Sequence, residues 1–446
     1  MTTTETTPKL LPAIEQPGLI AVPVAEPAVR GAFPTFEQVV YLALAVLAAI
    51  AHFWMLDVRA LHHDETLHAT YSWYIYIGNG YMHDPLLHGP FLYYLGSFLY
   101  FLFGDTDFSA RLGAALFGTI LTVLPFFIRR EIGRTAALAA SVYLLLSPTF
   151  LYVGRFFRHD IYSIVFELLV VIAIVRYAST RRALWLYVGI AAFALMYVNQ
   201  ETSYLFLLMM ATPLVLLLLW RVFKPGILLV GALGVALALL VFVLPGEAVV
   251  DGSHTAERDP QTDEMVILAP GPIFGWGPIE TEDNNYALRI RNRADNTAGN
   301  LFASMAGYIG DLWLFFRHPA ILTGIGLLLG TIALLVWLIW LRRDSEGRSV
   351  WARATATGDP ILSTYGSLLA DRRWISALAL GFSIYAIFFT AFFTNIIGLI
   401  SGTTGSLLYW LAQHNVERGG QPSHYYLFLL GVYEPIVLLG ASPVRA

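Results

Sequence analysis

Residues 204–244 read YLFLLMMATPLVLLLLWRVFKPGILLVGALGVALALLVFVL, in which two apolar runs flank a short segment that carries Arg221 and Lys224. A helix needs roughly 17–25 mostly apolar residues to cross a bilayer, and runs 204–220 and 226–244 both reach that length. Comparable apolar runs occupy residues 38–56, 112–128, 135–150, 161–175, 183–198, 321–341, 374–396 and 425–439. The sequence therefore predicts an all-α, polytopic integral membrane protein with about ten transmembrane helices.

The composition supports this class and excludes several others. Hydrophobic residues make up 57% of the 446 residues and charged residues only 13%, whereas about 25% of a soluble domain is charged. A cytosolic enzyme, a disordered chain and a secreted disulfide scaffold are therefore excluded. The net charge of −4 provides no basic field for a nucleic acid. The absence of cysteine excludes disulfides, thiolate catalysis and Cys-ligated zinc.

The arginine and lysine residues predict the orientation. Two further apolar stretches, 91–103 and 301–316, are interpreted as outer-face helices that do not cross. Most of the 27 Lys and Arg residues then fall on one side, which the positive-inside rule assigns to the cytoplasm. Residues 1–33 are polar and rich in Pro and Thr, and we interpret them as a disordered cytoplasmic tail rather than a cleaved signal peptide. Residues 34–446 form the predicted transmembrane domain, with outer loops at 57–109 and 245–319, the second a candidate lid.

Ionisable residues gather in the first outer loop. Asp64 and Glu65 follow the first span, and a helix that starts near Asp64 places this carboxylate on the same face as His68. Such a carboxylate can take a proton from a hydroxyl, although Asp64 can equally be a helix cap. The other candidates of this loop are His63, His83, Asp84 and His88. The histidines and acids also leave a divalent metal open, but their spacing matches no known metal signature, so no ligand is assigned.

Later outer loops add further candidates. Arginine side chains suit phosphate oxygens, so a cluster that opens the span at 161–175 indicates an anion site; the alternative is a lipid-headgroup anchor. The fifth outer loop combines polar residues with Tyr425 and Tyr426, which favours a site for a phosphate and a sugar or isoprenoid face, or else an aromatic belt. These candidates are Arg155, Arg158, His159 and Asp160 in the second loop, Glu201 in the third, and His414, Arg418 and Gln421 in the fifth.

Several of these residues lie in stretches that resemble the GT-C superfamily of polytopic glycosyltransferases. The connection Phe103-Gly104 followed by Phe108-Ser109-Ala110-Arg111-Leu112 resembles that of the protein O-mannosyltransferases and the aminoarabinose lipid A transferase. Within the superfamily, the chain is most similar to the group labelled "flippase activity-associated". That similarity is carried by His63-Asp64-Glu65, Asp84-Pro85, His88-Gly89-Pro90-Phe91 and Arg418-Gly419-Gly420-Gln421-Pro422.

The resemblance implies a function and roles. Such enzymes use polyprenyl-phosphate sugars on the non-cytoplasmic face, with Asp64 as general base, Glu65 as its partner or orienting group, and Asp160 as a support beside the donor phosphate. We therefore expect an inverting transferase that passes a sugar, a hexose such as mannose, to a protein, lipid or glycan acceptor, without a required metal. The alternative is a non-enzymatic flippase accessory or a scaffold subunit. Few span interiors carry charge, with Glu167 the main exception, which disfavours transport.

Overall fold

The structure is a computed structural model of the chain. It describes residues 35–81, 83, 88–241, 246–247, 268–269, 316, 319–396, 398–400, 402–403, 422 and 424–435. The predicted tail, the apolar stretch at 301–316 except for Phe316, and most of the candidate lid therefore lie outside the described residues. So do the candidate site residues Asp84, His414, Arg418 and Gln421.

The described residues are almost entirely helical, which confirms the all-α prediction. Two short strands, β1 (Gly246–Glu247) and β2 (Leu268–Ala269), pair antiparallel. A 3₁₀ turn η2 (Leu124–Ile128) extends α4, and a π-helical turn η4 (Trp337–Leu341) extends α13. The α-helices are α1 (Phe36–Phe53), α2 (His63–Tyr76), α3 (Phe91–Phe103), α4 (Asp107–Val123), α5 (Arg134–Leu146), α6 (Pro148–Val153), α7 (Asp160–Thr180), α8 (Leu184–Tyr197), α9 (Ser203–Val222), α10 (Pro225–Val241), α13 (Pro319–Val336), α14 (Val350–Thr355), α15 (Pro360–Ala370), α16 (Arg373–Phe389) and α18 (Tyr425–Tyr433).

Each apolar run that the sequence assigned to a span contains a helix. Among the described residues, five helices are long and apolar enough to cross a membrane, and a sixth span results if the pair α15 and α16, bent by 69°, counts as one. The other apolar helices are shorter. The chain is therefore a multi-pass membrane protein, and the count of ten spans stays a prediction.

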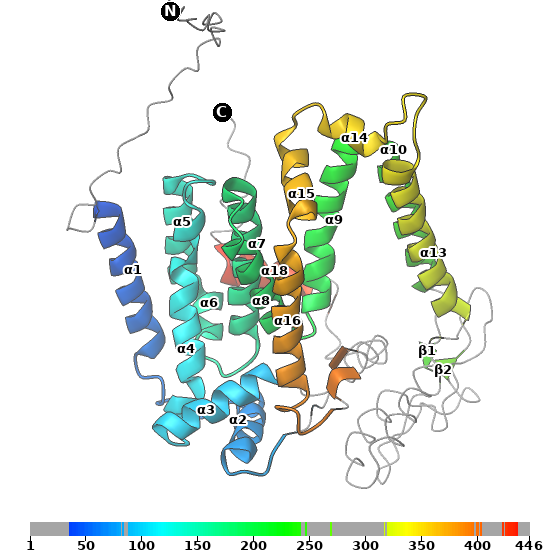
Figure 1. Cartoon of the computed structure of the whole chain (residues 1–446). Helices are drawn as coiled ribbons and strands as arrows, with labels where there is room; N and C mark the ends of the chain where they lie inside the picture. The colour runs from blue at the N-terminus through cyan, green and yellow to red at the C-terminus, as the bar shows by residue number, and fades with distance from the viewer. Residues whose placement is uncertain are drawn as a thin grey trace, which may run out of the picture. The chain divides into compact units, whose positions relative to one another are not determined.

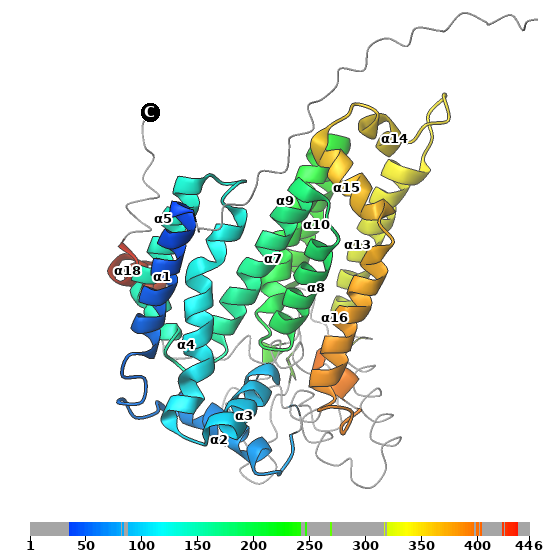
Figure 2. The ribbon, with the colours of Figure 1, turned by 60° about the vertical axis from the view of Figure 1, so that its left-hand side comes forward.

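The compact unit Tyr41–Ala446 contains the helices that position the candidate site. α7 packs against α4 and α8, α8 packs against α16, and α2 pairs with α3. Figures 1 and 2 show α2 and α3 lying across one end of the upright helices α4, α7 and α16. A cluster of buried residues joins α3, α4 and α7, with Leu92, Ala114, Phe157, Ile161 and Tyr162 wholly or almost wholly buried. Small residues on α4 allow this close approach of helices within a membrane.

The start of α2 is specified locally. The side chain of His62 accepts a hydrogen bond from the backbone N–H of Asp64 at 3.2 Å, and the Glu65 carboxylate accepts one from the backbone N–H of His62 at 2.9 Å. This reciprocal arrangement is a capping box. The helix therefore begins one residue before Asp64, and the cap is His62 rather than Asp64, which leaves the Asp64 carboxylate free of capping.

A glycine lets the first loop meet the turn between α8 and α9. The N–H of Gly89 donates to the Asn199 carbonyl at 3.2 Å, and the N–H of Phe91 donates to the Val198 carbonyl at 3.0 Å. A Cβ atom at Gly89 would overlap the backbone of Val198 and Asn199. Residue 89 is therefore restricted to glycine by the approach of two backbones, which keeps His88 beside the α8–α9 turn.

This contact predicts the effect of Gly89→Ala. The added methyl group forces the two backbones apart, so we expect the variant to lose about 1–3 kcal/mol of stability and part of its activity. Thermal unfolding of the purified protein in lipid nanodiscs measures the loss. Gly234→Ala is the matched control, because no atom lies within 4 Å of a Cβ at that helical position. The control should be neutral or slightly stabilised, and an equal loss in both variants would disprove the proposed overlap.

Candidate functional site

A buried ion pair joins the first loop to α4. Arg111, 1% exposed, donates from Nε to Oε1 of Glu65 at 2.7 Å and from Nη2 to Oε2 at 2.8 Å, and the Glu65 side chain is fully buried. The remaining donors of Arg111 reach the carbonyls of Leu56, Arg59 and Ala60 at 2.7–3.1 Å. One guanidinium therefore fixes both the turn that follows α1 and the first turn of α2. This two-point geometry is specific to arginine.

The Glu65 carboxylate is also saturated by other donors. Its Oε1 accepts the backbone N–H of Phe157 at 3.0 Å, and its Oε2 accepts Nη2 of Arg59 at 2.8 Å. Burial raises the pKa of Glu65, but the hydrogen bonds from Arg111, His62 and Phe157 outweigh burial and leave the pKa below its usual value. Glu65 is therefore an anion that ties the loop before α7 to α2, and its oxygens face protein donors.

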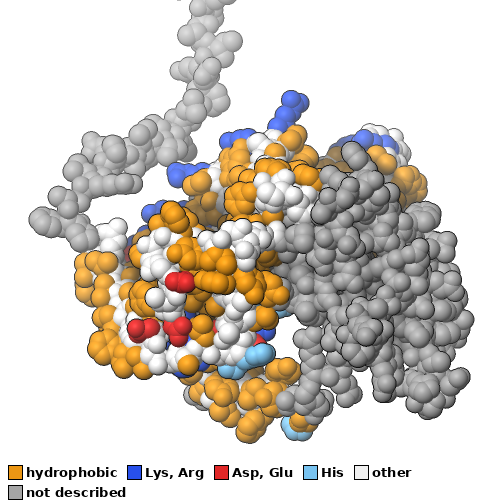
Figure 3. All heavy atoms as spheres, turned by 90° about the horizontal axis from the view of Figure 1, so that it is seen from below, with side chains coloured by type: hydrophobic (Ala, Val, Ile, Leu, Met, Phe, Trp, Pro, Cys, Tyr) orange, Lys and Arg blue, Asp and Glu red, His pale blue; other side chains and the backbone are white. Residues whose placement is uncertain are grey.

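Asp64, the neighbouring residue, points the other way. Arg158 donates from Nη1 to Oδ2 of Asp64 at 3.0 Å, and its Nε lies 3.5 Å from Oδ2 of Asp160. The three side chains are all about 40% exposed. Seen from the end that carries α2 and α3, acidic and histidine side chains reach a surface that is otherwise largely hydrophobic (Figure 3). One arginine therefore holds together two solvent-accessible carboxylates from different parts of the chain.

A buried row of histidines lies behind this group. The ring centroids of His68 and His159 are 4.9 Å apart, and those of His159 and His88 are 5.2 Å apart, with the rings meeting edge to face. The Nδ1 atom of His68 lies 2.9 Å from the hydroxyl of Tyr93, and Nδ1 of His88 lies 2.8 Å from Oε2 of Glu201. The structure thus brings together His68, His88, His159 and Glu201, which come from three different segments of the chain.

Burial lowers the pKa of three histidines in this region, His68, His83 and His159. The pKa of His68 is lowered to about 3 by burial first and then by the charges of His88 and Arg158. Burial also lowers the pKa of His83 to about 3, helped by His88, and it lowers that of His159 well below its usual value. These three rings are therefore neutral near neutral pH and do not serve there as cations for a phosphate.

The other predicted residues lie in different surroundings. Arg155 donates to the carbonyls of Ala51, Trp54 and Met55 at 2.7–3.2 Å, so its guanidinium closes the end of α1. His63 is exposed at the first position of α2. His83 packs edge to face on Phe389, and neither of its ring nitrogens has a hydrogen-bond partner among the described residues. The described part of the chain holds no group of three or more His, Asp or Glu side chains arranged for a metal ion.

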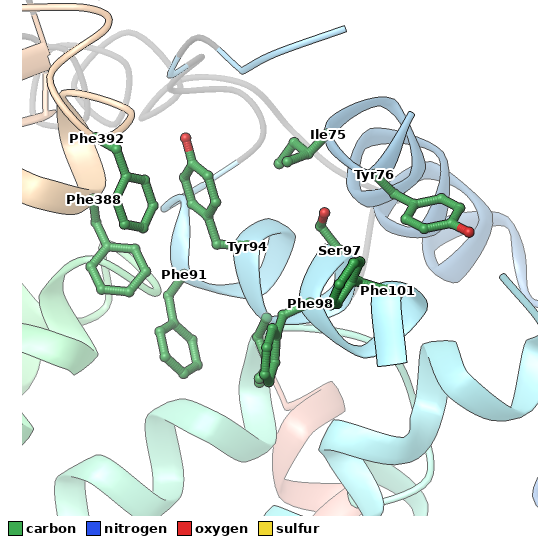
Figure 4. Close-up of a pocket in the computed structure, with 10 residues that line it drawn as sticks. Ile75, Tyr76, Phe91, Tyr94, Ser97, Phe98, Phe101, Phe388 and Phe392 are labelled. Atoms are coloured by element: carbon green, nitrogen blue, oxygen red, sulfur yellow. The ribbon is translucent and has the colours of Figure 1, made fainter. Parts of the chain in front are cut away.

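The structure also contains an aromatic pocket of about 520 Å³. It lies between α2, α3 and the end of α16, and Tyr94 of its lining directly follows Tyr93, the partner of His68. In Figure 4, Phe388 and Phe392 approach Phe91 and Tyr94, and their ring centroids are 5.0–6.0 Å apart in the contacting pairs. Its lining is almost wholly apolar, which suits a hydrocarbon chain.

Sequence reasoning did not assign a site role to Arg111, Arg59, Tyr93 or Asn199. Asn199 donates to the His159 carbonyl at 2.8 Å and to Ser163 at 2.9 Å, so it anchors the start of α7. The signal for Arg111 was present, because an arginine at the head of the apolar run 112–128 must find a partner. Tyr93 and Asn199 carry no local signal, because their partners are distant in sequence. Arg59 lies six residues before Glu65, but no helical spacing links the two.

Removal of Arg111 should be far more costly than removal of Arg158. Arg111→Met leaves the Glu65 anion buried without its main partner, so we expect a loss of about 3–5 kcal/mol. Arg158→Gln breaks a half-exposed pair and should cost only about 0–1 kcal/mol. Thermal unfolding in nanodiscs compares the two. Adding Glu65→Gln to Arg111→Met should recover part of the loss, and no recovery would contradict an uncompensated charge as the cause.

Acidification should destabilise the protein through its buried histidines. The pKa of His83 is about 3 when folded and about 6.5 when unfolded, so the unfolded chain binds more protons between these values. Stability therefore rises with pH in this window and is lost on acidification. His83 should contribute a loss of ~2 kcal/mol between about pH 6.5 and pH 5.

His83→Phe tests this contribution, since a phenyl ring keeps the contact with Phe389 and cannot be protonated. The variant should lose less stability than the wild type when unfolding midpoints are compared at about pH 7 and pH 5. His63→Asn, which removes an exposed histidine of the same loop, is the control and should behave as the wild type. An unchanged acid response in His83→Phe would contradict the prediction.

Part of the chain is similar to a known protein family. Residues 87–245 match the family described as dolichyl-phosphate-mannose-protein mannosyltransferase. The matched stretch contains Arg111, Arg158, Asp160 and Glu201 and begins after Asp64. No curated protein matches the chain.

Two solved structures are similar to the chain. One is the S. cerevisiae protein O-mannosyltransferase Pmt1-Pmt2 complex bound to the sugar donor, with 20% identity over 42% of this chain and 28% of that chain, and a TM-score of 0.36. The chain thus spans less than a third of the yeast chain. The other is ArnT from Cupriavidus metallidurans in the apo state, with 16% identity over 83% of this chain and 76% of that chain, and a TM-score of 0.35. Over residues 87–245 the chain is similar to the dolichyl-phosphate-mannose-protein mannosyltransferases, which confirms the GT-C resemblance that the sequence indicated.

Proposed function

We propose that the chain is a membrane glycosyltransferase. It transfers a sugar from a polyprenyl-phosphate donor to a hydroxyl of an acceptor on the non-cytoplasmic face. The observation that carries this proposal is the pair of accessible carboxylates, Asp64 and Asp160, bridged by Arg158 at 3.0 and 3.5 Å. The family match over residues 87–245 supports the same reaction class. The description of that family favours mannose as the hexose and a protein as the acceptor, with a lipid or glycan as the alternative acceptor.

Asp64 is the general base in this proposal. Its carboxylate is 40% exposed and takes one hydrogen bond from Arg158 on Oδ2. An accessible carboxylate held in a fixed orientation is suited to receive a proton from an incoming hydroxyl. Glu65 is a positioning residue, because its oxygens are enclosed by Arg111, Arg59 and backbone donors.

The donor phosphate belongs near Arg158 in this proposal. The guanidinium is 40% exposed, so it has surface left for a further anion, and Asp160 keeps it oriented. Arg155 donates to backbone carbonyls at the end of α1 and therefore stabilises that turn instead of binding the donor. The neutral histidines His68, His83 and His159, together with His63, His88 and Glu201, surround the space in which we place the sugar.

The proposed reaction is a single displacement that inverts the anomeric carbon. The acceptor oxygen forms a bond to the anomeric carbon, and the bond from that carbon to the donor phosphate oxygen breaks. The acceptor proton passes to Asp64, and polyprenyl phosphate leaves with the electron pair. The residues contribute alignment and charge placement, which supply much of the acceleration in such sites. The aromatic pocket beside Tyr94 would hold the first isoprene units of the donor.

A donor-release assay tests the proposal. The purified protein in lipid is incubated with a panel of radiolabelled polyprenyl-phosphate hexoses, with and without EDTA, and the released sugar is measured. We expect release from one donor by the wild type and at least a hundredfold less release by Asp64→Asn, because general-base removal costs about 10²–10⁴ in rate.

Asp57→Asn is the matched control, since it removes an exposed acid of the same loop; it should keep wild-type release. Wild-type turnover in Asp64→Asn would disprove the base assignment. Transbilayer movement of labelled donor without any released sugar would instead favour a flippase accessory. Loss of release in EDTA would assign a divalent metal to the first-loop histidines.

A further inference from the structure

The residue that ends α7 adopts an unusual backbone conformation. Arg181 follows Thr180 with φ 54° and ψ 20°, the left-handed region, and its N–H still bonds the Tyr177 carbonyl. Glycine usually fills this position because a side chain there costs about 1–2 kcal/mol. A strained residue at a helix end points to a constraint on its side chain.

The Arg181 guanidinium is incompletely satisfied. Its Nη2 makes only long contacts, 3.5 Å to the Pro360 carbonyl and 3.4 Å to Oγ of Ser363. Its Nη1 is buried and has no hydrogen-bond partner in the described part of the chain, where no carboxylate pairs with Arg181 either. A guanidinium whose donors are only partly satisfied favours a further anionic partner.

An apolar groove of about 530 Å³ opens beside this arginine, between α7, α8, α9 and α15. Tyr177 and Ala178 line it just before Arg181, while Ile361 and Thr364 line it next to the two residues that Arg181 contacts. Arg181 therefore lies at the mouth of the groove. Figure 2 shows α9 and α15 meeting at the end of the molecule away from α2 and α3.

The extent of the groove matches one leaflet of a bilayer. Its lining runs from 170 to 178 on α7 and from 185 to 193 on α8, which is about 12 Å along each helix. On α9 it runs from 206 to 217, which is about 17 Å. The hydrocarbon core of a bilayer is about 30 Å thick, so one leaflet contributes about half of it. α7 itself has 21 residues and separates Arg181 from Asp160 by about 30 Å. Along α7 the groove therefore lies in the leaflet opposite to the candidate active site.

We propose that this groove binds an anionic phospholipid of that leaflet. An acyl chain would lie between α7, α8, α9 and α15, and the headgroup phosphate would pair with the guanidinium of Arg181. Arg182 is exposed next to it and adds a second positive charge, which favours a headgroup of net negative charge over a zwitterionic one. The site is separate from the Asp64 centre, so it stands whether or not the protein transfers sugar.

Native mass spectrometry of the full chain tests the site. The delipidated protein is titrated with phosphatidylglycerol and with phosphatidylcholine of the same acyl chains. We expect the wild type to bind phosphatidylglycerol more tightly and Arg181→Gln to lose about tenfold in that affinity, the equivalent of one charge-assisted hydrogen bond. Arg343→Gln is the matched control, because it removes an exposed arginine that follows η4, an element that does not line the groove.

A second variant tests whether the lipid acyl chain occupies the apolar groove. Ala211 of α9 lines the groove, so Ala211→Trp should fill it and weaken both phospholipids while the elution volume and helical content stay as in the wild type. An equal loss of phosphatidylglycerol affinity in Arg181→Gln and Arg343→Gln would mean that the effect comes from general surface charge, and it would overturn the proposed site. Equal affinity of the wild type for both lipids would overturn the anionic preference. Displacement of phosphatidylglycerol by stoichiometric polyprenyl phosphate would assign the groove to the sugar carrier instead.

Discussion

The buried ion pair between Glu65 and Arg111 is the interaction on which the geometry of the candidate site depends. It joins the first turn of α2, the turn after α1 and α4 through one guanidinium, and Glu65 adds the loop before α7 through the N–H of Phe157. These segments lie at the end of the helices, where apolar packing alone does not fix a register. Both oxygens of Glu65 and the donors of Arg111 are occupied, which offsets the cost of burying two charges.

The pair also explains why two adjacent carboxylates differ in what they can do. Successive residues of a helix are turned by about 100°, because there are 3.6 residues per turn. With Glu65 directed inward onto Arg111, Asp64 must project to the side, where it meets Arg158 and solvent. The enclosed carboxylate of Glu65 holds the surrounding segments together, and the accessible carboxylate of Asp64 can reach a bound molecule. The same reasoning separates Arg155, which closes the end of α1, from Arg158, which remains at the surface.

The two ends of the described helices offer different chemistry. The α2–α3 end combines accessible charges, neutral buried histidines and an aromatic pocket, which together suit a charged headgroup attached to a hydrocarbon chain. At the other end lie a groove and Arg181, which pairs with no carboxylate among the described residues, and these suit a bilayer phospholipid. α7 connects the ends, since Asp160 opens it and Arg181 follows it. A lipid bound at one end would therefore contact the helix that carries a residue of the other.

The sequence by itself determined the helical class, the membrane location and the loops that carry ionisable residues, because hydropathy and helix length are local properties of the chain. It also placed Asp64, Arg158 and Asp160 among the candidates. Only the tertiary structure decided their partners. Arg111 meets Glu65 from 46 residues away, and Arg158 meets Asp64 from 94 residues away. The neutral state of His68 and His83 likewise follows from burial by distant segments. Contacts and desolvation of this kind arise from packing, and no local pattern encodes them.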